Sequence, residues 1–478
     1  MVKRIQNFVS QLNGKTLRKY FYHLRSYGPK NTLKTILMKV REANLPPFPK
    51  IKPLLVPKIE LISFEDSLPF INRNISVVIP TKNAGKYFKY LLRKLRSQRG
   101  LKECEIIIVD SGSSDDTLSV ARKEGAKIID IAPEAFNHSL SRNRGAEDAS
   151  GDLLLFMVQD ALPLSNQWLW EMAKALEEND VVAVSCAEYP SSEQDLFYGM
   201  LAWNHYKTLN LDKDRILSWD KSCSFPIGIR SNSQINNISS LIKREIFEKY
   251  KFQKNYGEDL DLGMRLIRDG YKLGFLYTTR VMHSHHRSPY YFLKRAYVDK
   301  RFLAEIFGSF SYSDFNDYRM VLQDVVSLMC DINKLSVDIH HLRLPVSLPT
   351  LFEKIRTIIQ KGDGDWDWLR ENVVKDGELF RFMKSLIDHG KIGCRKFPSR
   401  ENGILPSFLS QLNLLENYAS RIYENVPECV LEEVLDSCYK IFALQCGGQL
   451  AYLYLSDSGN FSEWEYLEEM NKILTEGV

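Results

Sequence analysis

The sequence contains no apolar run of the ~18–20 residues that a transmembrane helix needs. Residues 1–15 are basic but lack the apolar core of a signal peptide, so we expect a cytoplasmic protein. The eight cysteines include no CxxC pair, which argues for reduced thiols and against a disulfide framework or a zinc site. No internal repeat or low-complexity tract is present either. With 478 residues, 44% of them hydrophobic and 26% charged, the chain has the composition of a globular protein with two or three domains.

Charge is distributed unevenly along the chain. Residues 1–58 contain 13 Lys+Arg and one acid, Glu42, so this segment has a charge of about +12. Because the whole chain has a net charge of +4, the remaining residues have a charge of about −8. A basic arm on an acidic body favours an anionic partner, either a membrane leaflet or nucleic acid, and a solvated basic helix is the simpler alternative. Because the body is acidic, we expect no nucleic-acid partner. Residues 1–44 are expected to be helical, and residues 44–58, with five prolines, to form an extended linker.

From Ile75 onward, short Val/Ile/Leu-rich runs alternate with amphipathic stretches. The predicted strands are residues 76–80, 105–110, 126–131, 152–158, 181–186 and 272–277. Continuous apolar strands separated by helices predict an α/β domain at residues 73–308, with a mainly parallel sheet covered by helices on both faces. Beyond this domain the strand pattern stops and helical spacing continues, which predicts an all-α C-terminal domain at residues 309–478.

Two acidic residues lie at the C-terminal ends of predicted strands. Asp110 ends the run EIIIVD, where it can accept hydrogen bonds from a base N–H or a ribose hydroxyl. Asp160 follows LLLFMV, where a rigidly held carboxylate can bind a divalent cation. Parallel strands end at one edge of a sheet, and open α/β sheets bind ligands there. The alternative for both residues is a structural cap or turn.

Three further segments carry reactive side chains. FNHSLSRNRGA (136–146) is rich in basic residues, and an arginine suits a diphosphate because its planar fork donates two parallel hydrogen bonds. GEDLDLGMRLIRDG (257–270) opens a helix with acids that can supply a general base, although helix capping alone would explain them. VMHSHHRS (281–288) places His283 and His285 on one face of a predicted strand, where imidazoles can bind Mn²⁺.

The segments FNHSLSRNRGA and GEDLDLGMRLIRDG occur in a fixed order with three other motifs, SVVIPTKN (76–83), IIIVDSGSSDDT (106–117) and GDLLLFMVQDA (151–161). The order and identity of the motifs resemble the inverting family 2 glycosyltransferases of GT-A fold. The FNHxxxxRN and QDA variants are most similar to the bacterial rhamnosyltransferase branch. The resemblance covers residues 73–300. The chain departs from the family at Gln159-Asp160-Ala161, since most GT-A enzymes have a DxD-type pair of carboxylates there.

The resemblance implies roles for individual residues. Asp259 would be the general base, kept ionised by the helix dipole, and Glu258 would orient the acceptor. Asp160 and His283 would bind Mn²⁺ or Mg²⁺. The implied nucleotide-sugar-binding residues are Pro80, Thr81, Asn83, Asp110, Ser111, His138, Arg142, Asn143, Gln159 and Asp160. The residues implied to contact the donor sugar or the acceptor are Asn236, Asn237 and Ser239.

The activity implied by the resemblance is inverting transfer of a hexose, L-rhamnose from dTDP-L-rhamnose, to a glycan or polyprenyl-linked glycan in bacterial surface polysaccharide (O-antigen) synthesis. A UDP-sugar donor, or a degenerate module that binds nucleotide or glycan without catalysis, are the alternatives. Residues 290–307 interleave aromatic and basic residues, which fits either a membrane headgroup interface or a helix packed between domains. In the first case this helix and residues 1–44 would give a cytoplasmic enzyme a peripheral contact with the cell membrane.

Overall fold

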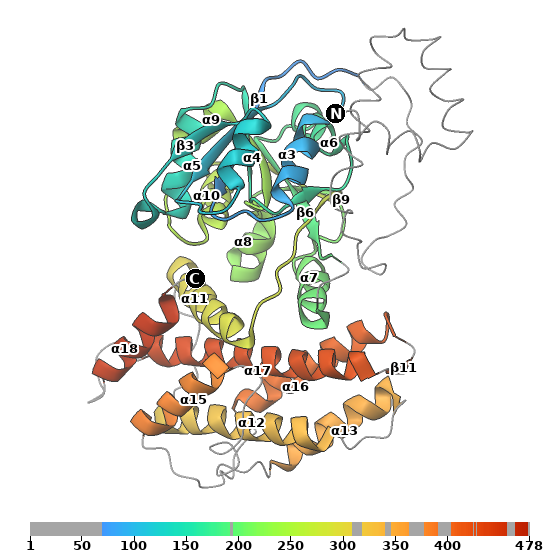
Figure 1. The fold of residues 1–478 in the computed structure, drawn as a ribbon, viewed down its shortest axis with the longest axis vertical. Helices are drawn as coiled ribbons and strands as arrows, with labels where there is room; N and C mark the ends of the chain where they lie inside the picture. Colours follow the sequence, from blue (N-terminus) through green and yellow to red (C-terminus); the bar gives the residue numbers. More distant parts are fainter. Residues whose placement is uncertain are drawn as a thin grey trace.

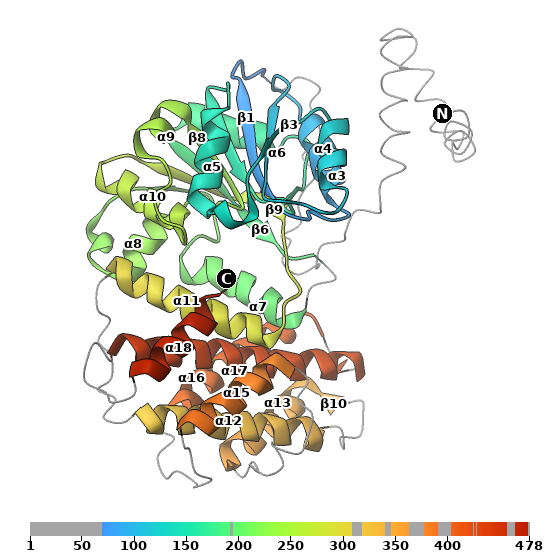
Figure 2. The ribbon, with the colours of Figure 1, turned by 60° about the vertical axis from the view of Figure 1, so that its left-hand side comes forward.

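The computed structural model describes residues 69–191, 195–307, 318–339, 346–362, 377–390, 403–423, 425–426, 428–456 and 464–476. The basic arm and linker predicted at residues 1–58 lie outside the described residues. A sheet with helices on its faces forms one part of the molecule and a layer of helices forms the other (Figure 1). Helices α7 (Leu196–Thr208) and α11 (Pro289–Phe307) lie between the two parts (Figure 2).

The sheet has nine strands in the order β3-β2-β1-β4-β8-β6-β9-β5, and β7 pairs with β9. Strands β5, β7 and β8 run opposite to the other six, so the sheet is mixed but mostly parallel, as predicted. The strands are β1 (Ile75–Thr81), β2 (Glu105–Asp110), β3 (Lys127–Asp130), β4 (Leu153–Met157), β5 (Leu162–Pro163), β6 (Ala183–Tyr189), β7 (Arg215–Leu217), β8 (Ser239–Lys243) and β9 (Leu273–Met282).

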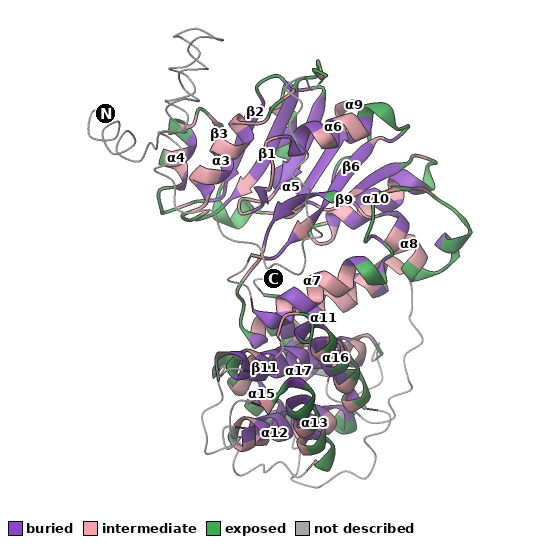
Figure 3. Ribbon diagram, turned by 90° about the vertical axis from the view of Figure 1, so that its right-hand side faces the viewer, coloured by how far each residue is buried: buried purple, intermediate pink, exposed green. Residues whose placement is uncertain are grey.

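The continuous apolar runs in the sequence arise because both faces of the sheet are covered. In β1, Val77 and Ile79 face one core while Val78 faces the other, since successive side chains of a strand point to opposite faces. Helices α3 (Phe88–Arg96), α4 (Thr117–Lys123) and α6 (Trp168–Glu178) cover the first face. Helices α5 (His138–Glu147), α9 (Arg244–Tyr250) and α10 (Glu258–Arg268) cover the second. Figure 3 shows the central strands buried between these layers.

The predicted helical character of the C-terminal region is confirmed. Its described helices are α12 (Tyr318–Ile339), α13 (Leu348–Lys361), α15 (Gly377–Gly390), α16 (Ile404–Ala419), α17 (Glu428–Ser456) and α18 (Trp464–Thr475). Two short strands, β10 (Val346–Ser347) and β11 (Asn425–Val426), pair with each other. None of the helices in the described ranges combines the length and the hydropathy that a membrane crossing requires.

Packing links α7 and α11 to the helical region. Phe197 of α7 and Phe292 of α11 belong to the same buried cluster as the apolar side chains of α12, α16 and α17. Helix α11 approaches α17 closely at Gly447, where a Cβ would collide with the carbonyl oxygen of Leu293. The apolar face of α11 is therefore covered by protein. This matches a helix packed between domains, one of the two environments predicted for residues 290–307.

A buried ion cluster also joins the two parts. The ammonium of Lys440, a residue of α17 that is 1% exposed, lies 2.8 Å from Asp195 and 2.7 Å from Asp436. Asp195 is the N-cap of α7, since its carboxylate accepts a hydrogen bond from the backbone amide of Tyr198. Lys440 thus fixes the start of α7 on the helical region.

We expect Lys440→Met to lower the free energy of unfolding by about 3–5 kcal/mol, because removing one partner leaves a buried carboxylate without its counter-charge. Urea titration followed by circular dichroism measures this loss. Lys472→Met, on the exposed side of α18, is the matched control. A loss no larger than that of the control would contradict a stabilising role for the cluster.

Candidate active site

A cavity of about 770 Å³ lies where the strands of the sheet end. Of the sixteen site residues predicted from the sequence, twelve line it: Pro80, Thr81, Ser111, His138, Arg142, Gln159, Asp160, Asn236, Asn237, Glu258, Asp259 and His283. They come from the ends of β1 and β2, the segments after β4 and β9, the segment before β8, and the starts of α5 and α10. The strand-end argument therefore brings most of the predicted residues to one place.

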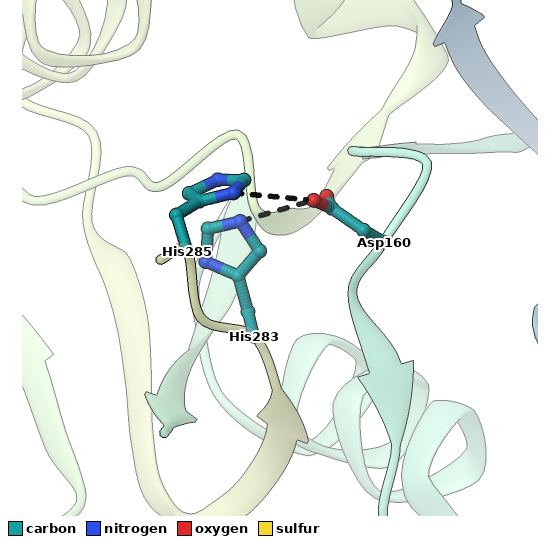
Figure 4. A group of neighbouring side chains, drawn as sticks. All are labelled: Asp160, His283 and His285. Carbon is teal, nitrogen blue, oxygen red and sulfur yellow. Dashed lines mark ion pairs between the residues drawn. The ribbon is translucent and has the colours of Figure 1, made fainter. Parts of the chain in front are cut away.

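Asp160 and two histidines form a compact cluster of metal-ligating groups (Figure 4). His283 Nε2 lies 3.5 Å from one carboxylate oxygen of Asp160, and His285 Nδ1 lies 3.6 Å from the other. Two ligand atoms that are each about 2.1 Å from one ion lie roughly 3.0–3.4 Å apart at octahedral or tetrahedral angles. The two measured distances are slightly longer and run to different oxygens of Asp160, but one ligand atom from each of the three residues lies within 4.8 Å of the others, and the N/O donor set suits a divalent cation.

The two histidines lie just after β9, which ends at Met282, and not within the strand as predicted. Both nevertheless turn toward Asp160. Glu188, at the end of β6, lies 2.6 Å from Nδ1 of His283 and so orients the opposite ring nitrogen toward the cluster. Burial lowers the pKa of His283, but the hydrogen bond and charge of Glu188 outweigh burial and the net pKa is raised. Burial, with the nearby His283, lowers the pKa of His285 to about 4.

The acidic pair at the start of α10 has two different environments. Glu258 is buried and lies 3.0 Å from the guanidinium of Arg142, and it accepts a hydrogen bond of 2.9 Å from the side-chain amide of Asn237. Asp259 is half-buried and accepts hydrogen bonds from the backbone amides of Asn237 (3.1 Å) and Leu260 (2.8 Å). Glu258 is thus committed to protein partners, while Asp259 faces the cavity and is held in place by the backbone.

The pKa of Asp259 is raised, first by burial and then by the neighbouring charge of Glu258, against the two amides and Arg142. This direction differs from the expectation that the helix dipole would favour the ionised form. Desolvation and the like charge of Glu258 both disfavour the ionised form of Asp259. A carboxylate with a raised pKa is a stronger base, which suits proton abstraction near neutral pH.

Four predicted site residues do not line the cavity, and each has a structural partner. Asp110 is 1% exposed and accepts hydrogen bonds from Thr81, Gly112 and Ser113, so it stabilises the turn after β2. Asn83 accepts hydrogen bonds from the backbone amides of Ser114 and Asp115. The side chain of Asn143 forms hydrogen bonds with the backbone of Phe252. Ser239 is buried against Met172.

Arg142, predicted to face the nucleotide, lines the cavity and donates to Glu258 and to the backbone carbonyl of His138. Its Nε has no hydrogen-bond partner within the described part of the chain. Glu188 was not predicted, because no motif surrounds it and the predicted strand at residues 181–186 ends before it. Its position near the end of β6, on the same edge of the sheet, is the signal that could have found it. The cavity residues of α11 were likewise not predicted as site residues.

Residues 76–234 match the model of the glycosyl transferase family 2. Residues 76–234, which carry strands β1 to β7, therefore correspond to a family 2 glycosyltransferase domain. The protein is accordingly a glycosyltransferase, and the predicted family is confirmed.

Two relatives named as rhamnosyltransferases agree with this assignment. The O-antigen chain rhamnosyltransferase WbaN of Salmonella anatum is 27% identical over 225 residues, which make up 45% of this chain and 68% of that protein. The O-antigen chain rhamnosyltransferase RfbN of Salmonella typhimurium is 26% identical over 220 residues, again 45% of this chain and 68% of that protein. Among solved structures, the mannosyltransferase PcManGT of Pyrobaculum calidifontis, in complex with GDP-Man and Mn²⁺, is 14% identical with a TM-score of 0.41, covering 78% of this chain and 88% of that chain.

The cluster of Asp160, His283 and His285 leads to a direct prediction about metal binding. Glu188→Gln should weaken Mn²⁺ binding by about 10–100-fold, because the carboxylate no longer orients the His283 ring, and His283→Ala should abolish binding. Free Mn²⁺ is measured by electron paramagnetic resonance during titration. His286→Ala, with a side chain that is 78% exposed, is the control and should bind as the wild type does. Wild-type affinity in Glu188→Gln would remove its role.

The raised pKa of Asp259 predicts the pH dependence of turnover. A base acts only when deprotonated, so kcat/KM should fall as the pH drops through the pKa of Asp259. This fall should occur at a higher pH than the ordinary aspartate value of about 3.9. Asp259→Asn should lower turnover by about 10²–10⁴-fold. Asp261→Asn, in the same helical turn but paired with Arg265, should retain activity. A pH profile identical in Asp259→Asn and wild type would exclude Asp259 as the base.

Proposed function

We propose that the protein is an inverting rhamnosyltransferase that moves L-rhamnose from dTDP-L-rhamnose to a hydroxyl of a glycan acceptor. The observation that carries this proposal is the joint position of the Asp160–His283–His285 cluster and the Asp259 carboxylate on one cavity. Two relatives whose names specify rhamnosyl transfer support the choice of sugar. The family 2 domain supports the inverting stereochemistry.

A cation held by Asp160, His283 and His285 would neutralise charge on the leaving diphosphate. The residues of the chain supply the rest of the reaction. Asp259 takes the proton from the acceptor hydroxyl while the oxygen of that hydroxyl forms a bond to the anomeric carbon. The bond between that carbon and the diphosphate oxygen breaks, and its electron pair leaves with the diphosphate. Attack and departure occur on opposite sides of the carbon, so the configuration inverts in one step without an enzyme nucleophile.

Substrate positioning follows from the buried groups behind the base. The Glu258 carboxylate and the Asn237 amide hold the start of α10, so Asp259 keeps one orientation in the cavity. On the strand-edge side, Gln159 exchanges two hydrogen bonds with the backbone of Lys82, which fixes the segment next to Asp160. The acceptor is proposed to be a glycan or a polyprenyl-linked glycan. Residues 1–44, which lie outside the described residues, are proposed to contact a membrane.

A donor screen tests the proposed function. Calorimetry and thermal shift would compare dTDP-rhamnose with UDP-glucose, UDP-galactose and UDP-N-acetylglucosamine, each with and without Mn²⁺ or Mg²⁺. We expect selective binding of dTDP-rhamnose that depends on the cation and is lost in His283→Ala. Preference for a UDP-sugar would retain the enzyme and replace the donor. If no nucleotide sugar binds, the catalytic proposal fails in favour of a degenerate binding module.

A further inference from the structure

Helix α11 extends along the cavity from the metal cluster to the base. Its first residue, Pro289, follows the histidine segment, and the guanidinium of Arg287 lies 5.1 Å from the ring centre of Tyr291. At the other end the ring of Phe302 packs against Gly257, immediately before α10. Gly257 has φ +61°, and a Cβ there would collide with that ring, so only glycine permits this approach. The two contacts fix both ends of the helix.

One face of α11 forms a polar and aromatic stripe on the cavity. Tyr291, Arg295 and Asp299 all line it and are spaced by four residues, which places them on one side of a helix. At 1.5 Å per residue the stripe is about 12 Å long. The side chains of Arg295 and Asp299 remain 46% and 45% exposed, so a ligand can reach them. Leu444 of α17 also lines the cavity, so the helical region closes this side.

Tyr256 connects this stripe to the segment that carries the base. Its hydroxyl donates a hydrogen bond of 2.5 Å to Asp299, and its ring centre lies 4.9 Å from the guanidinium of Arg295. Arg295 Nε donates in turn to the other oxygen of Asp299 at 3.3 Å. Tyr256 precedes Asp259 by three residues. A ring, a guanidinium and a carboxylate are therefore held together beside the base, and none of them takes part in the proposed chemistry.

The chemistry of this cluster selects among ligands. Aromatic rings present an apolar face with a polar rim, which matches the C–H face and hydroxyl edge of a sugar ring. A guanidinium donates in pairs and a carboxylate accepts in pairs, which suits neighbouring hydroxyls. Arg295 and Asp299 have opposite charges, so the cluster offers no net attraction to a phosphate. An acyl chain would offer no hydrogen-bonding group to either of these half-exposed charged side chains. A neutral pyranose is the ligand that satisfies every group.

We propose that Tyr256, Tyr291, Arg295 and Asp299 form the acceptor subsite and bind a sugar ring of the acceptor glycan beside the base. This inference rests on the proposed function, because the position of the acceptor follows from the role of Asp259. It assigns the acceptor specificity to α11 and its neighbours, whereas the strand edge on the other side of the cavity receives the donor.

The test uses the full-length chain, the donor selected by the screen above, and p-nitrophenyl glycosides of rhamnose, galactose, mannose and N-acetylglucosamine as acceptor probes. Arg295→Met should raise the KM for the glycoside at least tenfold, while the donor Kd from calorimetry stays within twofold of the wild-type value. Lys294→Met removes the same charge from the neighbouring position, where the ammonium contacts the carbonyl of Glu476 instead. It should change neither constant. Tyr256→Phe, which removes only the hydroxyl bonded to Asp299, should also raise the glycoside KM.

Two outcomes would overturn the subsite. One is an unchanged glycoside KM in both Arg295→Met and Tyr256→Phe. The other is a donor Kd that rises in parallel with the KM, which would mean that the cluster serves the donor. If the wild type uses no nucleotide sugar, the proposed function has failed on its own account. Saturation-transfer NMR then still tests the subsite, because glycosides should bind to the wild type and to Lys294→Met but not to Arg295→Met.

Discussion

A buried ion pair between Arg142 and Glu258 joins two segments that lie more than a hundred residues apart, at the starts of α5 and α10. The two side chains are only 5% and 8% exposed, so removing them from water is costly unless hydrogen bonds satisfy them. The carbonyl of His138 and the side-chain amide of Asn237 provide such bonds. Burial lowers the pKa of Arg142, and the charge of Glu258 opposes that shift. Because Asp259 is the next residue along α10, the position of the proposed base depends on this pair.

The sequence predicted those central strands whose side chains are apolar on both faces of the sheet, because such strands form continuous apolar runs. In β1, β2 and β4 nearly every residue is buried, so the runs were recognisable without knowledge of their neighbours. Strands β5, β7 and β8 were not predicted. The SSLIK segment of β8 begins with two serines and so lacks a continuous apolar run. It is a strand because β4 and β6 pair with it on either side, antiparallel to both. Its serines are fully buried in that position, so tertiary pairing outweighs local propensity.

The predictability of the site follows a similar division. Parallel strands end at one edge, so Ser111, Gln159 and Asp160 could be placed together from the strand pattern alone. The strand pattern does not say whether a polar side chain at that edge faces the cavity or its own turn. Asp110 accepts three hydrogen bonds from its own turn and one from Thr81 of β1, whereas Asp160 turns to the histidines. Glu188 and the stripe on α11 depend on contacts between distant segments, which no local motif records.

The helical region is part of the site as well as its neighbour. Tyr198 of α7 and Phe292 of α11 line the cavity, while the apolar sides of the same two helices pack in the core of the helical region. The Lys440–Asp195 pair fixes the start of α7, and the close contact at Gly447 sets the distance between α11 and α17. A boundary at residue 308 separates two patterns in the sequence. The wall of the cavity opposite the strand edge nevertheless depends on residues from both sides of this boundary, because α7 and α11 pack on the C-terminal helices. An acceptor that touches α11 is therefore bound by a surface whose shape the C-terminal helices determine.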